Sequence, residues 1–102
     1  MGNVMATELD PAGAELRAIH EIALFRDARV LEIGAGEGRL TFRYAKEAKW
    51  VVGIDAKEGE IRSATRNCPA DVLAHVRFLC ASVTALPFPA QKFEIVLFAS
   101  SL

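Results

Sequence analysis

Three glycines at every second position directly follow a short apolar run, and this pattern constrains the fold more than any other feature of the chain. The stretch VLEIGAGEGRLTF spans residues 30–42 and contains Gly34, Gly36 and Gly38. The apolar residues before them indicate a buried strand. Glycine permits a tight turn from strand into helix, and its missing side chain lets a ligand lie against the backbone. The pattern therefore predicts a ligand cradle at the carboxyl end of a strand.

Strands and helices alternate along the chain. Asp10 and Pro11 predict the start of a helix that continues to about residue 25. Further helices are indicated at 37–48 and 57–68, and apolar runs predict strands at 29–34, 50–55, 75–81 and 92–100. This alternation is typical of parallel pairing through right-handed crossovers. We therefore expect an α/β, Rossmann-like fold of three layers, α/β/α, with a parallel sheet truncated after the fourth strand.

The composition indicates one soluble domain comprising residues 1–102. The chain has 102 residues, of which 52% are hydrophobic and 25% charged, with a net charge of -1. It has no apolar run of the roughly 18 residues that a membrane span needs, and no apolar leader. We therefore expect a cytoplasmic location and no membrane partner. The lack of a basic excess also predicts no nucleic-acid partner.

The cysteines and histidines have no spacing that indicates a metal site. Cys68 and Cys80 stand apart from one another and from His20 and His75. Zinc sites need several such ligands at short, regular spacings. We therefore predict no metal and interpret both cysteines as reduced packing residues.

An acidic residue at the end of the next predicted strand suggests what the glycine cradle binds. Asp55 follows Gly38 by 17 residues, where a carboxylate can accept hydrogen bonds from both hydroxyls of a ribose. The alternative role for Asp55 is to cap the following helix, and the two roles can coexist. A dinucleotide-binding motif requires a third glycine at position 39, but Arg39 stands there. The spacing therefore disfavours a nicotinamide or flavin dinucleotide.

These motifs, in this order, resemble the class I methyltransferases that use S-adenosylmethionine. The stretch VLEIGAGEG resembles the first motif of the family, with Glu32 as the acid near the amino group of the methionine moiety. VVGIDAKEGEIRSA is similar to the second motif, with Asp55 at the ribose and Ala56 beside the adenine. FLCASVTALPFPAQKFEIVLFASSL resembles the third and fourth motifs. The resemblance covers about residues 28–102.

The resemblance implies S-adenosylmethionine as cofactor and a set of residues that bind it. Ser82 stands where the family usually has an acid that contacts adenine, so weaker adenine recognition is expected. The ending FASSL lacks the Asn-Pro-Pro or Asp-Pro-Pro signature of the branch that methylates amino groups, and we assign no catalytic residue. The cofactor-binding candidates are Glu32, Gly34, Ala35, Gly36, Gly38, Asp55, Ala56, Ser82 and Val83. By analogy, the LPFP turn suggests a small-molecule methyl acceptor.

The family's sheet has more strands than the four predicted here. Without a following strand, Phe93 to Phe98 would form an apolar edge with unpaired backbone groups. Such an edge can pair with another chain. We therefore expect a homodimer, or a second polypeptide that completes the sheet, through this last strand.

Three functions remain open from the sequence. The first is the cofactor-binding half of a methyltransferase, whose activity as an isolated chain the sequence leaves undecided. The second is a non-catalytic cofactor-binding or interaction module with the same fold, which Ser82 and the missing strands favour. The third is a fragment of an NAD-dependent oxidoreductase, which Arg39 disfavours.

Overall fold

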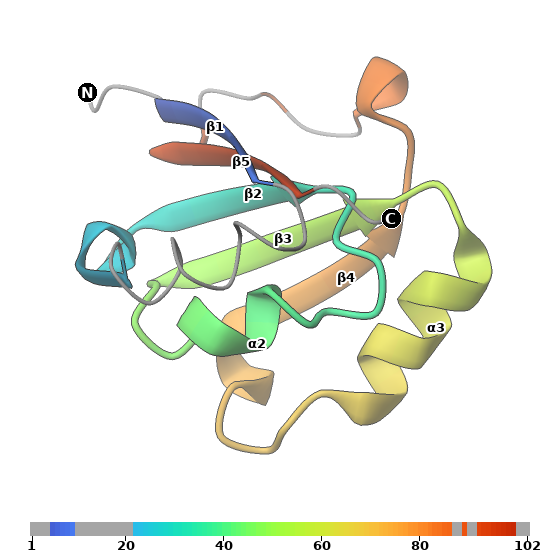
Figure 1. Ribbon diagram of the computed structural model, residues 1–102, viewed down its shortest axis with the longest axis horizontal. Coiled ribbons are helices and arrows are strands. Elements are labelled where there is room, and N and C mark those ends of the chain that lie inside the picture. The colour runs from blue at the N-terminus through green and yellow to red at the C-terminus, as the bar shows by residue number, and fades with distance from the viewer. Residues whose placement is uncertain (1–4, 10–21, 87–88, 90–91, 100–102) are drawn as a thin grey trace.

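A computed structural model shows a parallel sheet with helices packed against it (Figure 1). It describes residues 5–9, 22–86, 89 and 92–99. The strands are β1 (Met5–Leu9), β2 (Arg29–Ile33), β3 (Trp50–Asp55), β4 (Val76–Cys80) and β5 (Ile95–Ala99), and the α-helices are α2 (Thr41–Tyr44) and α3 (Glu58–Asn67). Three 3-10 turns complete the described elements, η1 (Ile22–Phe25), η2 (Leu73–His75) and η3 (Val83–Ala85).

All the sheet's strand pairs are parallel, in the order β1-β5-β2-β3-β4. The predicted α/β class and the four strands from residue 29 onward are confirmed. Long apolar runs form these strands because a parallel sheet is buried on both faces by its crossover connections. Helix α3 also ends as predicted, since Cys68 has an extended backbone directly before Pro69.

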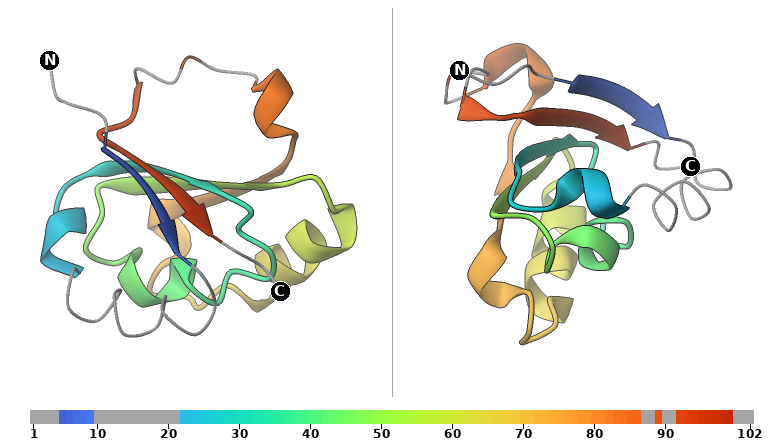
Figure 2. Two further views of the ribbon diagram at one scale, coloured as in Figure 1. Left: turned by 45° about the horizontal axis from the view of Figure 1, so that its top comes forward. Right: turned by 90° about the vertical axis from the view of Figure 1, so that its left-hand side faces the viewer.

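The two faces of the sheet carry separate apolar clusters. Side chains alternate between them, so that Val30 and Val51 join one cluster while Leu31 and Ile54 join the other. Helices α2 and α3 lie together over the first face, and η3 lies away from both (Figure 2). On the second face, Phe93 packs edge-to-face on Trp50 with ring centroids 5.4 Å apart. The chain between β4 and β5 thus contributes to the layer opposite the helices.

The predicted helix at 37–48 is much shorter in the structure. Only Thr41–Tyr44 is α-helical, and turns precede and follow it. Gly36 and Gly38 have φ of 57° and 88°, which no right-handed helix contains. After the helix, the amides of Glu47 and Ala48 donate to carbonyls three residues back, a 3-10 pattern. The glycines and this tightening limit α2 to about one turn.

The predicted helix at 10–25 is described only at its end. Residues 22–25 form the 3-10 turn η1, and residues 10–21 lie outside the described part of the chain. The amide of Ala28 donates to the Phe25 carbonyl at 3.0 Å and closes the connection into β2.

The prediction that β5 has an exposed edge is wrong. Strand β1 pairs with it in parallel, from Met5 opposite Ile95 to Leu9 opposite Ala99, while β2 pairs along its other side. The sheet therefore has five strands rather than four, and β5 lies inside it. The sequence offers little signal for β1, because MATEL is only five residues long and its partner lies about ninety residues away. The homodimer through Phe93–Phe98 was predicted from an open edge of this strand, and that edge is paired with β1. The homodimer itself stays a prediction.

Candidate functional site

The carboxyl ends of the strands bring the candidate residues to one edge of the sheet. In parallel pairing, Ile33 of β2 lies opposite Ile54 of β3, and Asp55 lies opposite Cys80 of β4. The glycine loop, Ala56 and Ser82 all leave the sheet there. The amide of Ala81 donates to the carbonyl of Asp55 at 3.1 Å, which joins the loops after β3 and β4. The edge that the sequence predicted as the ligand edge is thus built from several loops.

The glycine loop turns sharply and lies against neighbouring strands. All three of its glycines have positive φ, and Gly34 has 78°. A Cβ added to Gly34 would lie 2.6 Å from the carbonyl oxygen of Ala99. The amides of Gly34 and Ala35 each donate to the carbonyl of Ile54 at 2.9 Å. The fold itself therefore requires glycine at position 34, because of its positive φ and its close approach to Ala99, whether or not a ligand lies on the loop.

Asp55 holds the glycine loop and the start of α3 together. Its side chain is almost fully buried, with 7% exposure. Oδ2 accepts a 2.9 Å hydrogen bond from the Gly36 amide, and Oδ1 accepts one of 2.9 Å from the Lys57 amide. Lys57 rather than Asp55 occupies the N-cap position of α3, so the second bond ties Asp55 to the start of the helix without the capping role considered above. Each oxygen keeps a second lone pair, so a ribose hydroxyl can still donate to it.

Glu32 lies beneath the loop with no exposed surface. Its Oε1 accepts hydrogen bonds from Thr41 Oγ1 at 2.8 Å and from the Tyr44 hydroxyl at 2.5 Å. Its Oε2 is buried and has no hydrogen-bond partner among the described residues. Burial raises the pKa of Glu32 to about 7, although the bonds from Tyr44 and Thr41 act to lower it. A buried carboxylate oxygen without a partner is costly, and this cost is why burial raises the pKa of Glu32.

The remaining candidates line the same edge but differ in exposure. Ala35 is buried, whereas Ala56 and Ser82 are exposed and Val83 is 47% exposed. The Ser82 hydroxyl caps η3 by accepting from the Thr84 amide at 3.2 Å. Ser82 therefore presents a hydroxyl that is partly engaged by its own loop.

Sequence reasoning missed the two hydroxyl groups that hold Glu32. Neither Thr41 nor Tyr44 is among the candidate residues that the sequence indicates. The available signal was their spacing of three residues, which places both side chains on one helix face. The structure directs that face toward β2, where Glu32 is the buried acid.

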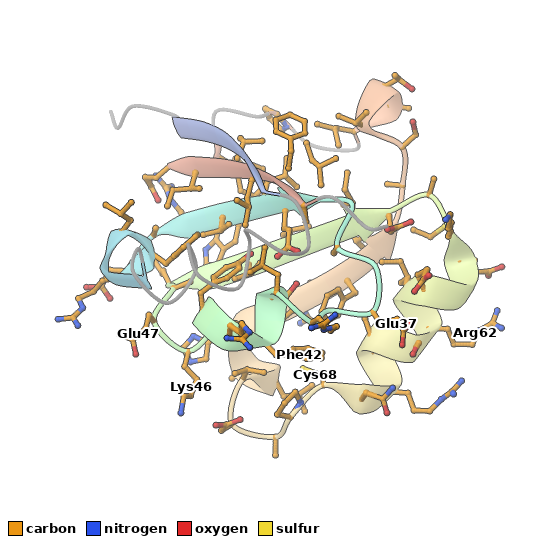
Figure 3. The ribbon with its side chains drawn as sticks, viewed as in Figure 1. Glu37, Phe42, Lys46, Glu47, Arg62 and Cys68 are labelled. Carbon is orange, nitrogen blue, oxygen red and sulfur yellow. The ribbon has the colours of Figure 1, made fainter. Side chains whose placement is uncertain are left out.

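Glu37 follows the same loop but lies apart from the Glu32 carboxyl. Glu37 is exposed and accepts a 3.3 Å hydrogen bond from the Ser63 hydroxyl of α3, and it lies beside that helix (Figure 3).

The described residues offer no metal site. Within them, no group of three or more His, Cys, Asp or Glu side chains is placed to hold a metal ion. None of the helices in that part of the chain is long and apolar enough to cross a membrane.

Comparison with known proteins identifies the family. A sequence model described as a methyltransferase domain matches residues 30–102. The chain belongs to this methyltransferase family. Its motifs are those of the class I enzymes that depend on S-adenosylmethionine, as the resemblance predicted.

Three relatives show the range of the methyltransferases that the chain is similar to. The uncharacterized methyltransferase YcgJ of Bacillus subtilis is 31% identical over 83 residues, which are 81% of this chain and 30% of that protein. Phosphoethanolamine N-methyltransferase 1 of Triticum aestivum is 39% identical over 65 residues, 64% of this chain and 12% of the relative. The 23S rRNA (uracil(1939)-C(5))-methyltransferase RlmD of Vibrio cholerae is 29% identical over 86 residues, which are 80% of this chain and 20% of that protein.

Solved structures share the fold of this methyltransferase chain. The crystal structure of YcgJ from Bacillus subtilis matches with a TM-score of 0.71 at 28% identity, over 83% of this chain and 36% of that one. A methyltransferase from Thiobacillus denitrificans in complex with S-adenosylhomocysteine matches with a TM-score of 0.54 at 26% identity, over 66% of this chain and 28% of that one. The chain thus spans about a third or less of the length of these relatives.

Proposed function

We propose that this chain binds S-adenosylmethionine at the carboxyl edge of its sheet and forms the cofactor-binding half of a methyltransferase. The observation that carries the proposal is the meeting of a buried, unpartnered Glu32 oxygen with a glycine loop that Asp55 holds. The donor set fits the cofactor, because its ammonium and sulfonium are cations and its ribose offers hydroxyl donors. A dinucleotide would offer Glu32 a negatively charged pyrophosphate instead.

Each candidate residue has a distinct part in holding the cofactor. Glu32 would meet the ammonium group, and Asp55 would accept from the ribose. The backbone of the loop would lie along the methionine moiety, with Gly34, Ala35, Gly36 and Gly38 as its members. Ala56, Ser82 and Val83 would line the adenine, with the Ser82 hydroxyl in place of the acid that the family uses.

The chemistry of the bound cofactor is the transfer of the methyl group on its sulfonium to an acceptor. The residues of this chain bind and orient the donor, and orientation is the main protein contribution to such a displacement. A carboxylate at Glu32 keeps the cationic end in place. We assign no catalytic residue.

We infer a small-molecule acceptor from the LPFP turn, with RNA as the alternative. The phosphoethanolamine enzyme among the relatives supports the first class. The prediction of no nucleic-acid partner lacks support, because another relative is an rRNA methyltransferase. Incubating the full chain with tritiated S-adenosylmethionine and either a small-molecule extract or total RNA distinguishes the two by where the label appears.

A cytoplasmic location and a homodimer belong to the same proposal. Both cysteines are free, and a reducing compartment keeps them so. Strand β1 lies at the edge of the sheet beside β5, so a homodimer that extends the sheet at this end would pair through β1. Imaging of a fluorescently tagged chain tests the location, and light scattering after size exclusion tests the dimer.

Calorimetric titration with S-adenosylmethionine, S-adenosylhomocysteine and NAD tests the proposed cofactor. We expect the first two to bind and NAD not to bind. Replacing Asp55 by Ala should weaken both by about 10- to 100-fold, because a hydrogen-bonded charged partner is lost. Asp71→Ala is the matched control, since Asp71 is exposed and forms an ion pair with Lys46 on the surface. Binding of NAD alone would support the oxidoreductase alternative, and cofactor binding without methyl transfer in any assay would favour the non-catalytic module.

A further inference from the structure

The buried carboxyl of Glu32 is held from one side only. Thr41 and Tyr44 both donate to Oε1, at 2.8 Å and 2.5 Å. Oε2 is equally buried and has no partner within the described residues. Two donors on one oxygen fix the plane of the carboxyl group, because the group can rotate only by giving up one of them. The arrangement leaves one defined oxygen, Oε2, without a hydrogen-bond partner among the described residues.

Tyr44 is itself fixed by packing. The side chain is fully buried, and its ring stacks on Phe25 with centroids 4.2 Å apart and planes 20° apart. Burial and the neighbouring charge of Glu32 raise the pKa of Tyr44 well above its ordinary value, so the phenol stays a donor. A protonated hydroxyl held in this way can only point its hydrogen at an acceptor, and Glu32 is the acceptor in reach.

We propose that Tyr44, together with Thr41, is a positioning residue that holds Glu32 so that Oε2 receives the ammonium group of S-adenosylmethionine. This inference rests on the proposed cofactor, and it assigns the specificity for the amino-acid end of that cofactor to two residues of α2. Neither hydroxyl need touch the cofactor. Their effect passes through the carboxyl of Glu32.

Protonation of Glu32 gives the proposal a measurable signature. A neutral carboxyl loses most of its attraction for an ammonium group, so cofactor binding should weaken as the pH falls through the pKa of Glu32. The bonds from Tyr44 and Thr41 lower that pKa against the effect of burial. Removing either donor should therefore move the loss of binding to higher pH.

Few other groups in the described part of the chain can produce this pH dependence. The strands beside β2 place Gly53 and Leu97 opposite Glu32, and η1 contributes Phe25 to the same core. Tyr44 is the titratable side chain that bonds to it. The nearest acid along β3 is Asp55, whose two oxygens face the amides of Gly36 and Lys57.

Calorimetric titration of the full chain and its Tyr44→Phe variant tests the proposal, with S-adenosylmethionine and 5′-methylthioadenosine as ligands. The second ligand has the same nucleoside but no amino-acid end. We expect Tyr44→Phe to weaken S-adenosylmethionine about tenfold at pH 7 and to leave methylthioadenosine unchanged, because a hydrogen bond to a charged group is lost only at Glu32. The pH at which binding is lost should rise, so that the variant loses a larger fraction of its affinity than the wild type between pH 7 and pH 6, where the α-amino group stays charged.

A second pair of variants makes the test independent of folding problems at Tyr44. Thr41→Val removes the other donor and should shift the midpoint in the same direction, whereas Thr41→Ser keeps the hydroxyl and should restore the wild-type profile. A carbon-13 titration of the Glu32 carboxyl in the free chain should show the same order of pKa values without any ligand. Circular dichroism confirms that each variant is folded.

The outcomes separate this inference from the proposed function. If the wild-type chain binds neither ligand, the proposed cofactor is wrong. If it binds both, and Tyr44→Phe and Thr41→Val leave affinity and pH profile unchanged, only the positioning role is wrong. An equal loss for both ligands would likewise overturn it, because a defect of the whole loop would then explain the result.

Discussion

At the scale of single residues, the glycine loop is shaped by steric demands as well as by a ligand. Gly34 combines a φ of 78° with a Cβ position only 2.6 Å from a backbone oxygen of β5. Gly38 has its Cβ position 2.6 Å from the ring of Phe42, which is a side chain and can move. Gly34 is therefore the position where both the backbone conformation and the space exclude any other residue.

Replacing Gly34 by Ala should lower the free energy of unfolding by about 1 to 3 kcal/mol, through backbone strain and the contact with Ala99. Gly59→Ala is the matched control, because Gly59 lies in α3 and has nothing within 4 Å of its Cβ position. There the same change should stabilise the chain by about 0.5 to 1 kcal/mol. Urea unfolding measures both, and equal effects at the two positions would contradict this account.

At the scale of elements, strand β1 changes what the last strand of the chain does. Strand β5 carries the most apolar stretch after residue 90, and β1 and β2 pair with its backbone on both sides. Its Ile95 and Leu97 side chains are 5% and 1% exposed because they pack into the apolar cluster on one face of the sheet. The short helix α2 has a different task, since it delivers two hydroxyls to Glu32. Both elements are short, but β1 pairs with a strand about ninety residues away, whereas α2 bonds to a side chain only 9 and 12 residues before its own.

Replacing Met5–Leu9 by five glycine and serine residues should expose the edge of β5. The amides of Ile95–Ala99 that pair with β1 should then exchange hydrogen faster, and the chain should associate as its concentration rises, because an open apolar edge can pair with another copy. Hydrogen exchange by mass spectrometry and size exclusion measure these effects. Strand β4 serves as the internal control, since it lies at the far edge of the sheet. Unchanged exchange in β5 would show that β1 does not protect it.

At the scale of the whole molecule, two carboxyl groups set opposite pH dependences of stability. Burial raises the pKa of Glu32 to about 7, while bonds from Arg29 lower the pKa of Glu94 to about 2. The backbone amide and Nε of Arg29 donate to Glu94 at 2.7 Å and 2.8 Å, at the start of β2 and opposite to the ligand edge. One acid is buried beneath the glycine loop, and the other joins the start of β2 to the start of β5.

The sign of each effect follows from where the proton is held more tightly. Folded Glu32 binds a proton more tightly than the unfolded chain does, so stability should fall by about 3 kcal/mol as pH rises from 4.5 to 7. Folded Glu94 binds it less tightly, so its contribution is complete above pH 4.5 and is lost as pH falls toward 2. Urea unfolding across this range should give a maximum near the ordinary carboxyl pKa. Glu32→Gln should flatten the upper limb and Glu94→Gln the lower limb, and a variant that leaves its limb unchanged would contradict the assignment.

The sequence by itself determined the strands from β2 to β5, the helix α3 and the edge where Glu32, the glycines and Asp55 meet. These follow from local signals, since apolar runs, prolines and glycines act on their own neighbourhood and parallel strands end at one edge. Only the tertiary structure decided that β1 covers β5, that α2 is a single turn, and that Thr41 and Tyr44 share one oxygen of Glu32. The pairing of β1 depends on a segment about ninety residues away, and the bonds to Glu32 depend on how α2 packs against β2. The apolar periodicity records neither of these contacts, nor the point at which α2 ends.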